Sequence, residues 1–305
     1  MATIDILGVP HTYELTAPTK SPDILVFIHG WLLSRRYWQP LIDQLAPYYQ
    51  CLAYDLRGFG DSQPLNGNSA SQGGGLLFAD VASMQAVNLG DTRRYSPDAY
   101  AAELGLMLQQ LNISSAWLVG HSLGGSIALW GASQMTDCVK GVICLNAGGG
   151  IYLKEAFERF RSAGQQLLKR RPRWLCSLPG IDLLFMRANV ARPIARSWGR
   201  QRLIDFVVAH PEAALGTLLD STTEAEVNRL PQVVSGLKQP VYFISGAKDT
   251  VMEPKYVRHL ASFHPLFQAC GDNVIEIPEC GHLAMLEQPE AVAAQILKLV
   301  DYYRS

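Results

Sequence analysis

The sequence lacks a dominant charge, an apolar run long enough to cross a bilayer, and the cysteine patterns of disulfide or metal scaffolds. Its 26 Lys and Arg against 27 Asp and Glu give a formal net charge of -1. That balance argues against nucleic-acid binding, which needs an excess of cations to neutralise phosphates. No stretch approaches the ~20 apolar residues of a membrane span, and the first residues show no basic leader. The six cysteines form no C-x-x-C pair. We therefore expect a cytoplasmic protein with no nucleic-acid partner.

Hydrophobic residues are nevertheless abundant, at 48% of 305 residues, so the chain can bury a large core. Short apolar runs with the length of buried strands alternate with helical segments. The runs are 24–28, 51–55, 116–120, 139–145, 241–245 and 274–277. Helices are predicted from Pro97, with Ser96 as its N-cap, and from Pro289 to about Tyr302. This alternation predicts an α/β fold, with a mostly parallel central sheet and helices on both faces.

The sequence Gly120-His-Ser-Leu-Gly124 is a G-x-S-x-G motif that follows one of these strands and opens a helix. A strand-to-helix turn of this kind is sharp, so glycines flank the serine and its hydroxyl projects above the sheet. The motif indicates Ser122 as the nucleophile. The alternative is a glycine-rich turn with no catalytic role.

A serine hydroxyl attacks only when a base takes its proton. Asp249 follows the strand 241–245 and His282 follows the strand 274–277. Both therefore fall at the carboxyl ends of parallel strands, where such sheets place their chemistry. The chain order Ser, Asp, His predicts a triad. In it Ser122 attacks, His282 moves the proton and Asp249 orients the imidazole.

An acyl-transfer site also needs two backbone N–H groups for the oxyanion. We expect one from Leu123, directly after the nucleophile, and one from Trp31, in the loop after strand 24–28. Gly30 lets the backbone approach closely. We place Gly30, Trp31, Leu32 and His121 at the substrate-binding wall, although apolar residues there can equally serve packing alone.

Five motifs occur in order along the chain: His29-Gly30, Asp55-Leu-Arg-Gly-Phe-Gly-Asp-Ser62, Gly120-His-Ser-Leu-Gly-Gly125, Gly246-Ala-Lys-Asp249 and Gly281-His282. On these motifs the chain resembles the α/β-hydrolase superfamily, in its serine-nucleophile, helical-cap, esterase- and lipase-like branch. The resemblance implies an α/β-hydrolase fold with an inserted helical cap, and a structural turn at 55–62. It says little about the substrate. The similar dehalogenase and epoxide hydrolase branches carry aspartate where this chain has Ser122.

The resemblance divides the chain into a first core segment, 1–149, a helical cap, 150–235, and a second core segment, 236–305. A Gly-rich insertion, about 66–95, interrupts the first core segment where similar proteins pass quickly to the helix at Pro97. Its role is open between a second lid element, an oligomer contact and a surface excursion.

Positive charge is concentrated in the expected cap. Residues 151–205 hold 12 Lys and Arg and 4 Asp and Glu, a balance of +8 that leaves -9 for the rest. Lys169 to Arg173 form one cluster, and Arg192, Arg196 and Arg200 recur every four residues, which predicts one basic helix face. This pattern is typical of contact with an anionic membrane surface or an acidic carrier. It is also typical of a solvated face over a packed one.

These observations predict a serine hydrolase that cleaves a carboxylic ester or thioester through an acyl-enzyme. A C–C bond or amide hydrolase with the same triad is one alternative, and a non-catalytic binding protein on this fold is another. Apolar residues of the expected cap, with Trp31, favour a hydrophobic acyl or alcohol group. Because no phosphate-binding loop and no metal-ligand spacing occurs, we expect neither a cofactor nor a metal.

Overall fold

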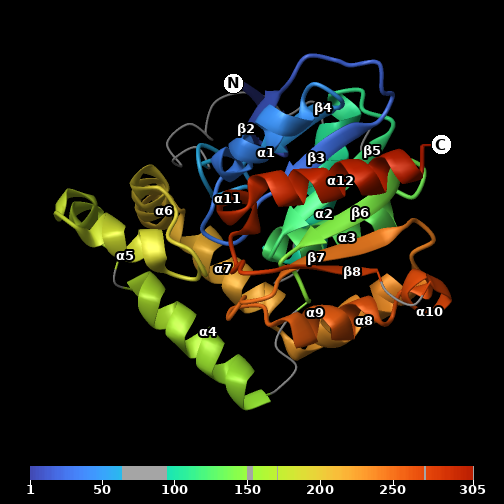
Figure 1. Cartoon of the computed structure of the whole chain (residues 1–305). Coiled ribbons are helices and arrows are strands. Elements are labelled where there is room, and N and C mark those ends of the chain that lie inside the picture. Colours follow the sequence, from blue (N-terminus) through green and yellow to red (C-terminus); the bar gives the residue numbers. More distant parts are fainter. Residues whose placement is uncertain (64–94, 150–153, 170, 271–272, 305) are drawn as a thin grey trace.

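The computed structural model describes residues 1–63, 95–149, 154–169, 171–270 and 273–304 (Figure 1). Its centre is an eight-stranded sheet with the order β1-β2-β4-β3-β5-β6-β7-β8. The strands are β1 (Ala2–Ile6), β2 (Val9–Leu15), β3 (Ile24–Ile28), β4 (Gln50–Tyr54), β5 (Ala116–His121), β6 (Val139–Leu145), β7 (Val241–Gly246) and β8 (Val274–Ile277). From β4 to β8 neighbouring strands pair in parallel, whereas β1 pairs with β2, and β2 with β4, antiparallel. The mostly parallel sheet is confirmed, and the hairpin β1–β2 extends it at one edge.

Helices cover both faces of this sheet, as the sequence predicts. One face carries α1 (Gln39–Leu45), α11 (Ala284–Glu287) and α12 (Pro289–Tyr302), while the other carries α2 (Pro97–Gln110), α3 (Leu123–Gln134), α8 (Glu224–Gly236) and α9 (Pro254–Ala261). The strand β3 shows why the buried runs are continuously apolar. Its Leu25 and Phe27 belong to the core on one face, and its Val26 and Ile28 to the core on the other. Burial on both faces removes the polar alternation of a half-exposed strand.

A helical insertion connects β6 to β7. It contains α4 (Lys154–Lys169), the 3₁₀ helix η3 (Arg173–Ser177), α5 (Ile181–Arg187), α6 (Arg196–Val208), α7 (Pro211–Ser221) and α8. Figure 1 shows α4, α5 and α6 standing to one side of the sheet. Leu203 and Phe206 of α6 are buried with the core, and the indole N–H of Trp31 donates to the carbonyl of Ala214 in α7 at 2.9 Å. Apolar burial and this hydrogen bond fasten the insertion to the loop after β3.

The structure bears on three expectations from the sequence: the basic helix face, the Gly-rich insertion and the lack of a membrane span. Arg192 lies before α6, which begins at Arg196, so the expected basic helix face through Arg192, Arg196 and Arg200 is wrong. The backbone of 189–192 instead forms a loop against the end of β8, described below. Nearly all of the Gly-rich insertion at 66–95 lies outside the described residues. Among the described residues, no helix combines the length and apolar character that a membrane span requires.

Candidate active site

Ser122 occupies a strained turn between β5 and α3. Its φ of 52° and ψ of -117° lie in a region that costs free energy for a residue with a side chain. The turn is held by the Ser122 N–H, which donates to the carbonyl of Leu145 at 3.0 Å. A Cβ on Gly120 would lie 2.1 Å from the carbonyl oxygen of Gly124, and one on Gly124 would lie 2.1 Å from that of Ile28. Both flanking positions therefore require glycine.

Asp249 and His282 come together at the carboxyl ends of β7 and β8. The Nδ1–H of His282 donates to Oδ2 of Asp249 at 2.8 Å. The other carboxylate oxygen of Asp249 accepts from the backbone N–H groups of Val251 and Met252, at 2.8 and 2.9 Å. Burial by itself would raise the pKa of Asp249, but the neighbouring imidazole and these donors together lower it. Asp249 is therefore an ionised, immobilised acceptor beside the imidazole.

Asn146 is a supporting residue that the sequence does not reveal. It follows β6 with a φ of 49° and is completely buried. Its side-chain amide donates to Oδ2 of Asp249 at 2.9 Å and to the carbonyl of Gly281 at 3.0 Å. Asn146 thus connects the loop of Asp249 to the loop of His282. An isolated asparagine after a strand carries no sequence signal for this role.

Glu287 performs a similar connection from α11. Its carboxylate accepts the backbone N–H groups of Gly281 and Leu283, which flank His282, at 3.0 and 3.1 Å. It also accepts those of Ala191 and Arg192 in the insertion, at 2.8 and 3.2 Å. The Glu287 side chain therefore holds the loop of His282 and the loop that follows α5 together. The approach is close enough that a Cβ on Gly281 would lie 2.6 Å from the nitrogen of Ala191.

His121 links the turn of Ser122 to His282. Its ring lies 4.9 Å from the His282 ring, centroid to centroid, and its Nε2–H donates to the His282 carbonyl at 2.7 Å. Complete burial, together with the nearby His282 ring, lowers the pKa of His121 to about 3, so this imidazole is neutral. Its Nδ1 has no hydrogen-bond partner among the described residues. The structure thus places His121 in contact with His282.

The loop after β3 lies against the serine turn. A Cβ on Gly30 would lie 2.7 Å from Nδ1 of His121 and 3.2 Å from Cβ of Ser122. Leu32 is buried in the core with a φ of 58°. Within the described parts of the chain, the backbone N–H groups of Trp31 and Leu123 donate to no acceptor. At the first residue of a helix such an N–H has no intrahelical acceptor. Both expected oxyanion donors are thus free to bind a ligand.

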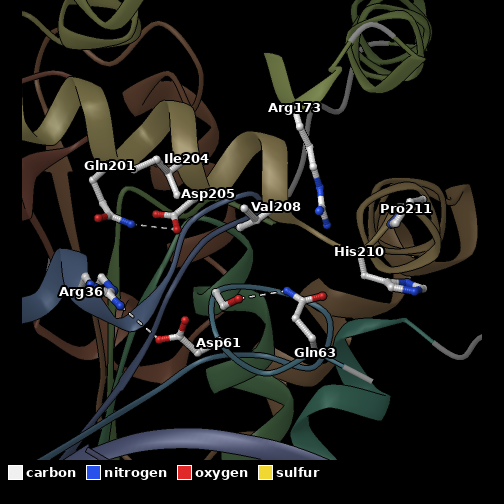
Figure 2. Close-up of a pocket in the computed structure, with 11 residues that line it drawn as sticks. Arg36, Asp61, Gln63, Arg173, Gln201, Ile204, Asp205, Val208, His210 and Pro211 are labelled. Carbon is white, nitrogen blue, oxygen red and sulfur yellow. Dashed lines mark hydrogen bonds and ion pairs between the residues drawn. The ribbon is translucent and has the colours of Figure 1, made fainter. Parts of the chain in front are cut away.

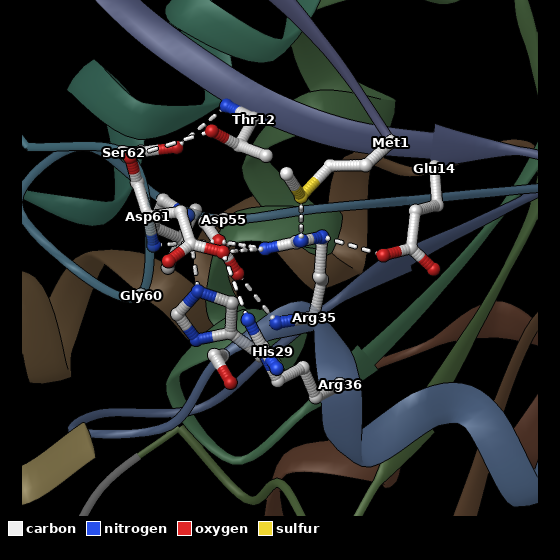
Figure 3. Close-up of polar contacts among 12 residues, drawn as sticks. Met1, Thr12, Glu14, His29, Arg35, Arg36, Asp55, Gly60, Asp61 and Ser62 are labelled. Atoms are coloured by element: carbon white, nitrogen blue, oxygen red, sulfur yellow. Dashed lines mark hydrogen bonds and ion pairs between the residues drawn. The ribbon is translucent and has the colours of Figure 1, made fainter. Parts of the chain in front are cut away.

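The motif 55–62 contributes to a polar cluster around the buried Arg35 (Figure 3). The guanidinium of Arg35 pairs with Asp55, with Asp61 at 2.9 Å and with Glu14 at 3.1 Å. His29 joins the cluster, because its Nε2 accepts the Leu56 N–H at 3.0 Å. Its Nδ1–H then donates to the Gly30 carbonyl at 2.8 Å. Burial lowers the pKa of His29. This neutral ring connects the cluster to the loop of Trp31.

A separate cavity of about 640 Å³ lies between α6 and the loop that follows β4 (Figure 2). None of the three triad candidates lines it. Arg36 pairs there with Asp61 at 3.2 Å, and Gln201 donates to Asp205 at 3.0 Å. The cavity offers no nucleophile beside a base, so the chemistry is better assigned to the strand ends.

The geometry at the strand ends suits acyl transfer. It combines a serine on a strained turn, an imidazole oriented by an ionised carboxylate, and two free backbone donors. Among the described residues, no group of three or more His, Cys, Asp or Glu side chains could hold a metal ion.

Comparison with known proteins agrees with this architecture. A synthase of 2-succinyl-6-hydroxy-2,4-cyclohexadiene-1-carboxylate from Enterobacter sp. (strain 638) is 28% identical over 281 residues, which cover 90% of this chain and 92% of that protein. A thermophilic esterase from Thermogutta terrifontis superposes with a TM-score of 0.73 at 19% identity and full coverage of both chains. A putative lipase from Acinetobacter baumannii AYE gives a TM-score of 0.76 at 18% identity, covering 99% of this chain and 91% of that one.

A family model described as the Alpha/beta hydrolase family matches residues 25–295. The matched segment runs from β3 into α12 and includes all five sequence motifs. The chain therefore belongs to the α/β-hydrolase family.

Proposed function

We propose that this protein is a serine hydrolase that cleaves a carboxylic ester or thioester through an acyl-enzyme on Ser122. The observation that carries the proposal is the 2.8 Å hydrogen bond between His282 and Asp249. This pair lies at the same sheet edge as the strained Ser122 turn. A serine in such a turn without a base nearby would be strain without function.

In acylation, His282 takes the proton of the Ser122 hydroxyl as its oxygen attacks the substrate carbonyl. Nε2 is the nitrogen that acts, because Nδ1 carries the proton donated to Asp249. The resulting imidazolium is stabilised by the Asp249 carboxylate. It then gives its proton to the departing alcohol or thiol.

In deacylation, the same imidazole activates a water molecule, which attacks the acyl-enzyme and releases the acid. Each step passes through a tetrahedral intermediate with a negatively charged oxygen. The N–H groups of Leu123 and Trp31 would bind that oxygen, and removing one such donor typically costs about 10²–10³ in kcat.

The charge of the surrounding loops supports an uncharged substrate. Residues 28–34, 116–134 and 279–288 contain no Lys or Arg. Lys248, next to Asp249, is half-exposed and forms an ion pair with Glu279. An anionic group beside the scissile bond would gain no free cation from these loops. We therefore infer that the groups flanking the ester or thioester are neutral and apolar.

The synthase relatives favour a second candidate. Their identity of 28% extends over 90–95% of this chain, so the reaction of those proteins is an alternative use of the same triad. By its name, their product carries a ring carboxylate and a succinyl group. The lack of Lys and Arg in residues 28–34, 116–134 and 279–288 weighs against this candidate.

Hydrolysis of p-nitrophenyl esters of increasing acyl length tests the primary proposal. We expect Ser122→Ala to lower kcat by about 10⁶-fold. Ser126→Ala, one helical turn further along α3, serves as the matched control and should retain activity. Equal activity of wild type and Ser122→Ala would refute the nucleophile assignment. Inactivity of both proteins on every ester and thioester offered would favour the non-catalytic alternative.

The second candidate is tested by complementation. A bacterial strain that lacks the synthase is supplied with the wild-type gene or with the Ser122→Ala gene. Restoration of the 2-succinyl-6-hydroxy-2,4-cyclohexadiene-1-carboxylate pool by wild type alone would establish the synthase reaction. No restoration, together with ester hydrolysis in vitro, would support the hydrolase.

A further inference from the structure

Large apolar side chains gather on the outer side of the insertion. Trp174 in η3 is 60% exposed and Leu184 in α5 is 70% exposed. Leu167, Leu178 and Leu183 are exposed as well. Single exposed apolar residues are ordinary on a protein surface. Here five lie within eighteen residues of sequence, and groups of exposed apolar side chains mark interaction sites.

Unpaired cations lie between these apolar side chains. Lys169 and Arg187 are exposed, and neither has a partner among the described residues. Arg173 is exposed as well, but it lines the cavity of Figure 2 and is not assigned to this group. The only acidic residue from 167 to 187 is Asp182, which is buried and paired with Arg196 at 2.6 Å. The surface formed by the exposed side chains of Leu167, Lys169, Trp174, Leu178, Leu183, Leu184 and Arg187 is called here the outer face. It is therefore apolar and positively charged, with no free negative charge among the described residues.

The packing of η3 and α5 explains why these side chains point outward. In α5, Asp182, Phe185 and Met186 face inward, whereas Leu183, Leu184 and Arg187 are exposed. The inner sides of both elements are fastened to α6, because Arg200 donates to the carbonyl of Cys176 in η3. Arg202 of α6 donates to the carbonyls of Phe185 and Ala188.

The cations that hold this packing are thus distinct from those left free. Arg196, Arg200 and Arg202 are occupied by Asp182 or by backbone carbonyls. Among the described residues, Lys169 and Arg187 make no such contact. The excess positive charge of the insertion therefore divides into a structural set and a set available to a partner.

We propose that the outer face docks the protein on an anionic lipid bilayer. Tryptophan and leucine would enter the interfacial region, while the cations stay at the level of the negative headgroups. Each cation near an anionic surface strengthens binding by about fivefold, so Lys169 and Arg187 together contribute about 25-fold.

A bilayer fits this surface better than a folded protein does. The centre of a protein interface is depleted of charged residues and is packed as closely as a core. The outer face combines cations with apolar side chains, and a fluid bilayer accommodates that mixture without shape complementarity. Figure 1 shows α5 at the periphery of the molecule, away from the sheet.

The same insertion lies against the loop that contains Trp31. A Cβ on Gly164 of α4 would lie 2.7 Å from Leu218 in α7 and 3.4 Å from the indole of Trp31. Docking through the outer face would therefore bring the helices over Trp31 close to lipid. The docking itself does not depend on Ser122, so it is testable whether or not the proposed hydrolase activity holds.

Flotation with vesicles tests the proposal on the full chain. Vesicles of phosphatidylcholine alone are compared with vesicles of phosphatidylcholine and phosphatidylglycerol, at low and high salt. We expect binding to the anionic vesicles that weakens as salt rises. Trp174→Ser with Leu184→Gln should weaken binding by removing the inserted groups.

A charge variant tests whether binding depends on the cations of the outer face or only on the total positive charge of the protein. Replacing Lys169 and Arg187 by glutamine should weaken binding by about 25-fold. The matched control replaces Lys20 and Lys238, which lie outside the insertion, by glutamine. Circular dichroism verifies that both charge variants are folded.

Three results would overturn the proposal. One is no binding to anionic vesicles at low salt. Another is an equal loss of binding in the two charge variants. The third is self-association through Trp174 and Leu184 without vesicle binding, which would make the outer face a protein interface. Ser122→Ala should float like the wild type, so loss of ester hydrolysis and loss of docking are distinguishable.

Discussion

The ionisation of Asp205 should control how tightly the insertion packs on the core. Asp205 lies on α6 and is only 3% exposed. Its carboxylate accepts hydrogen bonds from Ser34 and from Gln201, both at 3.0 Å. Burial raises its pKa to about 7, because these neutral donors only partly offset the loss of solvation. Ser34 belongs to the loop of Trp31, so the pair joins the insertion to the candidate site.

The free energy of unfolding should therefore fall as pH rises. The folded protein retains the proton up to about pH 7, whereas the unfolded chain releases it near pH 3.8. Between these values the folded state binds more protons, and each pH unit costs about 1.4 kcal/mol of stability. The whole window corresponds to about 4 kcal/mol, of which about 3 kcal/mol falls between pH 5 and 8. Above pH 8 the contribution is constant.

Asp205→Asn removes the titration while keeping the shape of the side chain. We expect the stability of the variant, relative to wild type, to rise by about 3 kcal/mol from pH 5 to pH 8. Urea unfolding, followed by circular dichroism at each pH, measures this difference. Asp137→Asn, at an exposed aspartate, controls for the loss of one negative charge. A difference between wild type and Asp205→Asn that stays constant from pH 5 to 8 would refute the reasoning.

Three further outcomes follow from the site and its supports. Asp249→Asn should lower kcat on p-nitrophenyl esters by about 10⁴-fold, since the amide no longer selects the reactive tautomer of the imidazole. Gly30→Ala should lower kcat, because its Cβ would meet Nδ1 of His121 at 2.7 Å, and steady-state kinetics measures the loss. Arg35→Met should cost about 3–5 kcal/mol in urea unfolding, because Asp55 is left as a buried unpaired charge. Adding Asp55→Asn to Arg35→Met should recover part of that loss.

Different results would contradict each of these expectations. Full activity of Asp249→Asn would remove the carboxylate from the mechanism. If Gly30→Ala keeps wild-type kcat, the loop after β3 does not approach the reacting groups closely. No recovery of stability in the double variant would mean that the Asp55 charge is not what destabilises the Arg35 variant.

The alternation of elements was accessible from the sequence, because strands buried on both faces are continuous apolar runs. The predicted strand 24–28 coincides with β3, and the predicted start of the helix at Pro97 coincides with α2. The N-terminal hairpin was not anticipated. The polar residues His11 and Thr12 interrupt β2, so it has no apolar run. It becomes a strand by pairing with β4 at the sheet edge.

The triad candidates could also be named from the order of the motifs along the chain. Each candidate follows a predicted strand and has a glycine within three residues of it. Their roles stay predictions, although Asp249 and His282 do meet in the structure. The residues that position them were out of reach. Asn146 and Glu287 contact partners about one hundred residues away, and nothing in their local sequence distinguishes them from other polar residues.

The class of fold, the order of the motifs and the excess of positive charge in the insertion could all be read from the chain alone. They are properties of composition and local pattern, which depend on near neighbours along the chain. Which cations pair with a carboxylate or a carbonyl, and which stay exposed, became known from the three-dimensional structure. It alone brings Asn146 to Asp249, Glu287 to the loop of His282 and Asp205 to Ser34. Contacts of this kind depend on how helices pack across the sheet, and distance along the chain does not determine distance in space.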